Sequence, residues 1–168
     1  TLNRLVDGKG AVAGIEARDL QRLRYKDSDT PILTFAELLD MVDGDVPLLV
    51  EIKSEWAPPD PQFLGKVARL AGSYRGPVAL MSFDPEVMMA VRELAPKIPR
   101  GIVSGTYAGH GWWNRNLTKA RAEALRDLLL SGPVAPQFYA YQVSALPTPV
   151  TRFVREVLVH RCGMRELV

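Results

Sequence analysis

The sequence predicts an α/β fold in which helices cover a parallel β-sheet. Four segments with the character of strands are each followed by a segment with helical periodicity, and this alternation is typical of parallel sheets. The first of these strands begins with a continuous apolar run, as expected where both faces of a strand are covered. Three helix starts carry an Asp-Pro or Thr-Pro pair, which supplies an N-cap and a proline at the first helical position.

The expected elements follow one another along the chain. Residues before 34 are irregular apart from a short helix at 16–24, and a capping box of Thr34 and Glu37 then starts a helix that ends at Gly44. The strands are expected at 47–53, 78–83, 101–103 and 138–143. The helices between and after them start behind Asp60, Asp84, Thr118 and Thr148. The first of these four helices has an apolar stripe that should face the sheet, comprising Phe63, Leu64, Val67, Leu70 and Ala71.

Two architectures are compatible with this order of elements. A TIM (β/α)8 barrel takes about 250 residues, so this chain of 168 residues would be an incomplete barrel of four strand–helix units without its first and last strands. An open, doubly wound sheet could be complete at this length. Periodicity alone does not separate the two.

The composition excludes several classes of protein. With 47% hydrophobic and 24% charged residues, the chain has the balance of a globular protein. A net charge of only +2 gives no reason to expect nucleic acid as the main partner. Cys162 has no second cysteine with which to form a disulfide or a thiolate zinc site. No apolar run approaches the ~20 residues of a transmembrane helix, and the start at Thr1 suggests an internal piece of a longer protein.

The most informative polar residues are Glu51 and Lys53, at the end of the first expected strand. In parallel α/β folds the working residues lie at the carboxyl ends of strands. Residues two apart on a strand project from the same face, so this carboxylate and this ammonium should lie together. The carboxylate could bind a hard divalent cation, and the lysine could hold an anionic group such as phosphate. A structural ion pair at the strand end is the alternative interpretation.

The other strand ends carry weaker candidates. Ser82 has no His or acidic partner at a recognisable spacing for a nucleophile, and Asp84 is expected to be a helix cap. A Gly-rich loop at 105–113 contains His110, Trp112 and Trp113, and it could close over a ligand. Phe83 and Trp112 are the residues we expect in a substrate pocket, although the tryptophans could equally pack the loop onto the sheet. His160 is assigned no role, and Gly8, Gly10 and Gly14 do not form a dinucleotide-binding fingerprint.

An ordered set of four segments resembles the glycerophosphodiester phosphodiesterase family. The opening stretch 1–12 looks like that family's Thr-Leu-x-Arg-x-Thr-x-Gly-x-Gly segment, and residues 30–39 resemble its Pro-Thr-Leu-x-Glu helix start. Glu51-Ile52-Lys53 matches the family's Glu-Ile-Lys strand end, and residues 82–86 are similar to its Ser-Phe-Asp-Pro turn. Glu-Ile-Lys alone is a weak pattern, but the four segments in order, between residue 1 and about residue 158, are much more specific.

The resemblance implies a TIM-barrel hydrolase of lipid metabolism. Such an enzyme would cleave a small glycerophosphodiester with water to glycerol 3-phosphate and an alcohol. It implies a divalent cation, Mg²⁺ or Ca²⁺, held by three carboxylates, and a pair of catalytic histidines. Carried over onto this sequence, Glu51 is one metal ligand and Lys53 contacts the substrate phosphate. A metal and a lysine would neutralise the phosphoryl oxygens as charge builds up.

The sequence also departs from the family pattern. The family's two histidines and its Glu-x-Asp metal pair would lie upstream of Thr1, and neither His110 nor His160 occupies their positions. Residues 159–168 do not look like the family's next strand, so we expect an atypical or truncated tail there. Residues 1–168 would then form a partial barrel domain that is inactive alone. The alternatives are a phospholipase-like phosphodiesterase of the same superfamily, a non-catalytic binding domain on this scaffold, or a complete open-sheet domain.

Overall fold

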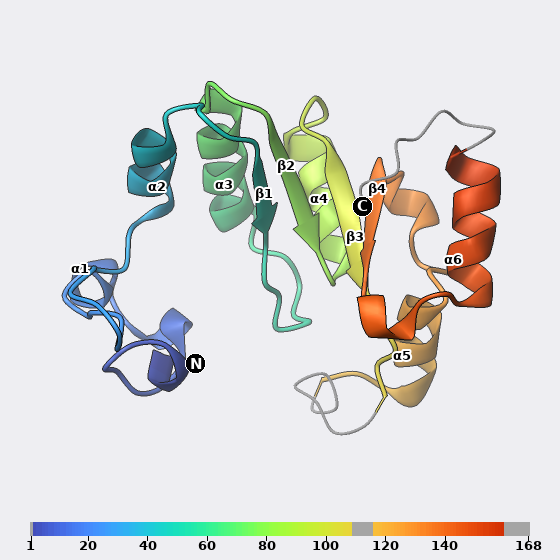
Figure 1. Ribbon diagram of the computed structural model, residues 1–168, viewed down its shortest axis with the longest axis horizontal. Coiled ribbons are helices and arrows are strands. Elements are labelled where there is room, and N and C mark those ends of the chain that lie inside the picture. Colours follow the sequence, from blue (N-terminus) through green and yellow to red (C-terminus); the bar gives the residue numbers. More distant parts are fainter. Residues whose placement is uncertain (1, 109–115, 160–168) are drawn as a thin grey trace. The chain divides into compact units, whose positions relative to one another are not determined.

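The computed structural model describes residues 2–108 and 116–159, and the chain divides into two compact units (Figure 1). The first unit is Thr1–Asp45 and the second is Val46–Val168. The second unit contains the sheet and therefore the strand ends on which the candidate residues lie.

The first unit consists of short turns and two helices. Its 3-10 turns are Leu2–Arg4 and Val12–Gly14, and its helices are α1 (Ala17–Leu20) and α2 (Phe35–Val42). The capping box of α2 is present as predicted: the Glu37 backbone N–H donates to Thr34 Oγ1 (3.2 Å), and the Thr34 N–H donates to the Glu37 carboxylate (2.7 Å). The helix was expected to end at Gly44; its last residue is Val42, and both Asp43 (φ 51°) and Gly44 (φ 91°) take positive φ values that stop it.

The second unit is built on four parallel strands, as the sequence predicted. They are β1 (Leu48–Glu51), β2 (Val78–Ser82), β3 (Arg100–Ser104) and β4 (Phe138–Tyr141), and they lie in the order β1-β2-β3-β4. The α/β class and the parallel sheet are therefore confirmed. Within the described residues the sheet is open, with β1 and β4 at its edges.

The helices of this unit start at the predicted caps. They are α3 (Pro61–Ser73), α4 (Pro85–Leu94), α5 (Lys119–Arg126) and α6 (Pro149–Phe153), and the last continues as a π-helical segment, Val154–Val159. Two 3-10 turns, η4 (Gly132–Val134) and η5 (Val143–Ala145), flank β4. In each α-helix the predicted cap side chain accepts the N–H bonds of the first turn; the caps are Asp60, Asp84, Thr118 and Thr148. No helix in the described part of the chain is both long and apolar enough to cross a bilayer.

The core lies between the sheet and the helices α3 and α4, which run side by side along it (Figure 1). Leu80 on β2 and Met88 and Val91 on α4 are completely buried, and Leu64 and Ala71 anchor α3. The apolar stripe predicted for α3 is wrong at Phe63, which is half exposed. Neighbouring helical residues are about 100° apart around the axis, so Phe63 is turned away from the face that Leu64 buries.

Candidate functional site

The register of the strands determines which residues at their carboxyl ends project from each face of the sheet. Pairing across the sheet aligns Glu51 with Met81, Met81 with Gly101, and Gly101 with Phe138 in one row. Paired residues of a parallel sheet project from the same face, and residues two apart return to that face. Lys53, Phe83, Val103 and Ala140 therefore form the next row on the same side, at the carboxyl edge. Ile52 and Ser82 project from the opposite face, where both are buried.

Glu51 and Lys53 form an ion pair at the end of β1. Lys53 Nζ lies 2.7 Å from Glu51 Oε1, and the lysine side chain is 80% exposed while the glutamate side chain is 28% exposed. Exposed pairs of this kind contribute only about 0–1 kcal/mol to stability. The pair is therefore a minor stabilising feature, and its ammonium can reach a ligand without leaving a buried partner behind.

A cavity of about 340 Å³ opens along the same row of residues. Phe83 lines it, as predicted for a substrate pocket, and Trp112 lies outside the described residues. The remaining lining comes from the ends of β3 and β4 and from the loop after β3: Val103, Ser104, Gly105, Tyr107, Ala140, Tyr141 and Gln142. The wall is predominantly apolar, so the cavity suits an uncharged organic group better than a phosphate.

Three aromatic side chains shape this cavity. The ring of Phe83 meets the ring of Tyr107 edge to face, with centroids 6.4 Å apart. Burial raises the pKa of Tyr107 to about 12, because the phenolate would lose its hydration; a hydrogen bond with Ser104 opposes the shift. Tyr141 is fixed by hydrogen bonds from its hydroxyl to the carbonyls of Gly105 (3.2 Å) and Arg126 (3.1 Å), and burial raises its pKa as well.

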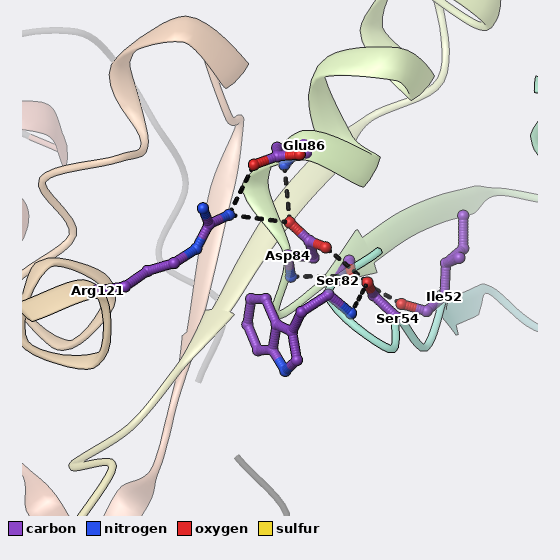
Figure 2. A network of polar contacts seen from close by, with 7 residues as sticks. Ile52, Ser54, Ser82, Asp84, Glu86 and Arg121 are labelled. Atoms are coloured by element: carbon purple, nitrogen blue, oxygen red, sulfur yellow. Dashed lines mark hydrogen bonds and ion pairs between the residues drawn. The ribbon is translucent and has the colours of Figure 1, made fainter. Parts of the chain in front are cut away.

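A polar network lies behind the strand ends, on the helix-covered face (Figure 2). Ser82 Oγ donates to the carbonyl of Ile52 (2.7 Å), and Ser54 Oγ donates to Asp84 Oδ2 (2.6 Å). Asp84 is only 1% exposed, yet its other oxygen caps α4 by accepting from the N–H of Glu86 (3.0 Å). Asp84 is thus the helix cap that the sequence predicted, and Ser82 is a structural hydrogen-bond donor in this arrangement.

Arg121 brings positive charge to the buried carboxylate of Asp84. Its Nη2 donates to Glu86 Oε1 (2.7 Å) and lies 3.9 Å from Asp84 Oδ1 (Figure 2). Burying a carboxylate is costly unless it is paired and hydrogen-bonded. Asp84 meets both conditions through Arg121, Ser54 and the N–H of Glu86, so these contacts offset the cost of burying its carboxylate.

Among the described residues, Glu51 is the carboxylate at the front of the strand ends that could bind a metal ion. Glu51 supplies a hard oxygen donor that is accessible from the open face, which fits the role of one ligand. Within residues 2–108 and 116–159, however, no three His, Cys, Asp or Glu side chains come together as a metal site. The described residues therefore do not form a complete metal site by themselves.

Several sequence candidates are not brought to this site by the described structure. His110, Trp112, Trp113 and His160 lie outside the described residues. The roles of Ser54, Tyr107 and Tyr141 were not predicted from the sequence. Tyr141 ends the fourth strand and Tyr107 follows the third within three residues, so a wider reading of the strand ends would have found both. Ser54 likewise follows β1 within three residues, but its contact with Asp84, 30 residues away in the sequence, has no local signal.

Polar residues and a cavity at the carboxyl edge of a parallel sheet define this protein as an α/β protein of the kind that binds small molecules there. The chain belongs to the glycerophosphoryl diester phosphodiesterase family, whose family model matches residues 1–153. This match confirms the family resemblance of the sequence. At the level of the family it implies a TIM-barrel-like fold and a phosphodiesterase activity on small glycerophosphodiesters. A search of curated proteins gave no match.

Proposed function

We propose that this protein takes part in the hydrolysis of a glycerophosphodiester to glycerol 3-phosphate and an alcohol, as a step of lipid and glycerol metabolism. In this reaction water adds to phosphorus, the ester P–O bond breaks, and the departing alkoxide takes up a proton. The observation that carries the proposal is the pair Glu51 and Lys53 at the carboxyl edge of the sheet, on the same face as the row of residues along which the cavity opens. Family membership supports the same reaction.

Lys53 is the proposed phosphate-binding residue. Its ammonium is 80% exposed and projects from the open face, and a lysine binds a phosphate oxygen as a compact point charge. The adjoining cavity, with Phe83 and Tyr107 in its wall, would receive an organic part of the diester. A phosphodiester has both kinds of group, so its charged centre and an organic substituent would occupy neighbouring positions.

Glu51 is the proposed metal ligand. A divalent cation, Mg²⁺ or Ca²⁺, would supply Lewis-acid stabilisation of phosphoryl oxygens when bound. Glu51 would contribute one carboxylate to the cation. Its present partner Lys53 would turn to the phosphate, so that the carboxylate and the ammonium would each bind a different group. The other ligands would have to come from outside the described residues.

Ligand binding by the purified chain tests the role of Lys53. Glycerol 3-phosphate should shift the side-chain NMR signals of Lys53 and the backbone amide signals next to it in a saturable way. In Lys53→Ala the saturable shift of these neighbouring amide signals should be abolished. Lys97→Ala is the matched control, because Lys97 is also exposed but precedes β3, at the amino ends of the strands and away from their carboxyl ends. An equal loss in both variants, or no response of Lys53 in the wild-type chain, would contradict the proposal.

Activity measurements test the predicted catalytic incompleteness of this chain. The family resemblance assigns neither His110 nor His160 to the positions of the catalytic histidines, so we expect no turnover of a glycerophosphodiester with Mg²⁺ or Ca²⁺. Robust hydrolysis that is abolished by Glu51→Ala would show that the catalytic groups are present in these 168 residues. A chain that binds neither the phosphate ester nor a cation would favour the non-catalytic interpretation.

A further inference from the structure

Two hydrogen bonds to buried side chains fix the backbone on either side of Lys53. The carbonyl of Ile52 accepts from Ser82 Oγ (2.7 Å), and Ser54 Oγ donates to Asp84 Oδ2 (2.6 Å). Ser82 is completely buried and Asp84 is 1% exposed, whereas Ser54 is half-buried. Both bonds run from the residues just after β1 to the Ser82–Asp84 turn at the end of β2, and both lie on the helix-covered face. Lys53, between them, points to the opposite face.

Each serine hydroxyl in this network has a defined direction. Ser82 Oγ accepts from the N–H of Asp84 (3.1 Å), which leaves its proton for the carbonyl of Ile52. Ser54 Oγ accepts from the N–H of Trp56 (2.9 Å), which leaves its proton for Asp84. Trp56 has φ 60°, an uncommon left-handed conformation for a residue with a large side chain. The bond to Ser54 helps to hold this turn, and so the loop after Lys53 is fixed as well.

We propose that Ser54, Ser82 and Asp84 form a clamp that positions the Glu51–Lys53 pair for its ligand. The three residues touch neither the cation nor the phosphate, and they act through the backbone of residues 52–54. This positioning role rests on the proposed function of Glu51 and Lys53. The clamp itself is a geometric feature that can be tested independently, since its loss should loosen residues 52–56 whether or not a ligand binds.

Asp84→Asn separates the clamp from the helix cap. The asparagine oxygen can still accept from the N–H of Glu86, because asparagine is as good an N-cap as aspartate. Its amide can still donate to the second lone pair of Ser54 Oγ, so the charge-assisted bond from Ser54 is replaced by a weaker bond between neutral groups. Asp60→Asn is the matched control, because Asp60 caps α3 in the same Asp-Pro context and takes no part in the clamp.

Amide hydrogen exchange of the whole chain is the first readout. In Ser54→Ala, exchange at residues 52–56 should accelerate about tenfold, the size expected when one hydrogen bond is lost, and in Asp84→Asn it should accelerate by a smaller factor because the bond is weakened. Ser54→Thr keeps the hydroxyl and should retain slow exchange. Asp60→Asn should leave the exchange rates of these amides unchanged. Ser104→Ala should also leave them unchanged, although Ser104, like Ser82, is a buried serine at a strand end that donates to a carbonyl. Unchanged exchange in both Asp84→Asn and Ser54→Ala would overturn the clamp.

The second readout connects the clamp to the ligand. The apparent affinity of the Lys53 side chain for glycerol 3-phosphate should fall about tenfold in Ser54→Ala and recover in Ser54→Thr. A melting temperature that stays close to the wild-type value would exclude general unfolding as the cause. If the wild-type chain shows no Lys53 response, the proposed function fails, while the exchange data still decide whether the clamp exists. If exchange accelerates and affinity is unchanged, residues 52–54 are clamped without positioning the ligand, and the positioning role is refuted.

Discussion

At the scale of single residues, Gly101 is packed directly beneath the ring of Phe138. A Cβ atom on Gly101 would lie 2.2 Å from Cε2 of Phe138, so no side chain fits beneath this ring without moving it. Gly101→Ala should therefore lower the free energy of unfolding by about 1–3 kcal/mol, as overpacking does. Gly65→Ala in α3 should raise it by about 0.5–1 kcal/mol, because its new methyl group meets open space. Urea unfolding measures both, and a common sign would refute this interpretation of the packing.

Tyr107 gives stability a dependence on alkaline pH. Burial raises its pKa to about 12, whereas in the unfolded chain the phenol ionises near 10.0. Between these values the unfolded chain gives up a proton that the folded protein retains, so the free energy of unfolding falls as pH rises. Below pH 10 the contribution is fully present, and it is lost as pH passes through about 12. Tyr107→Phe should flatten this slope in unfolding measurements at several pH values, and parallel curves for the two proteins would contradict the prediction.

At the scale of elements, helix starts could be predicted from the sequence with the greatest accuracy. The caps at Asp60, Asp84, Thr118 and Thr148 rest on local hydrogen bonds within three residues, so the local sequence determines them. The contacts of Ser54 and Arg121 span 30 and 35 residues, and they arise only when the sheet has assembled. For the same reason Glu51 and Lys53 could be predicted to lie together, while the clamp behind them could not.

The junction between β3 and η4 depends on a buried arginine. Arg100 is 6% exposed and donates from Nε to the carbonyl of Val134 (2.7 Å) and from Nη2 to that of Ala135 (2.8 Å). Arg100→Met should destabilise the protein by about 1–3 kcal/mol, because the buried carbonyl of Val134 and the part-buried bond to the carbonyl of Ala135 lose their charged donor. Arg92→Met, which removes an exposed donor to the carbonyl of Pro133 in the same turn, should cost less than about 1 kcal/mol. Denaturant unfolding of the pair tests this difference, which equal losses would contradict.

At the scale of the whole molecule, the sequence led to the α/β class, the parallel order and the family, and left the closure of the sheet open. Closure depends on which strands meet at the edges, and no local pattern encodes that. In the described residues β1 and β4 are edge strands, and Leu49 on β1 is 53% exposed. Edges of this kind offer unpaired N–H and C=O groups and apolar surface to other chains.

Self-association is therefore expected for this chain. Its melt should be broad and should depend on protein concentration, as an incomplete barrel predicts. Leu49→Lys should reduce association, whereas Leu129→Lys should not, because Leu129 is more exposed but lies outside the strands. Sedimentation velocity at several concentrations measures the effect. A monomer with a cooperative, concentration-independent melt would instead favour a complete open-sheet domain.

Residues 51–54 alternate between the two faces of the sheet, and this affects which substitutions can change the ligand of this protein. Glu51 and Lys53 face the open side, while Ile52 and Ser54 are held from behind by Ser82 and Asp84. The residues proposed to bind the ligand and the residues that fix the backbone therefore alternate along the same short segment. Substitutions at positions 51 and 53 can change the ligand while the scaffold tolerates them, whereas position 52 is constrained by the burial of the Ile52 side chain and position 54 by the hydrogen bond from Ser54 to Asp84. New specificity can thus arise here at little cost to folding.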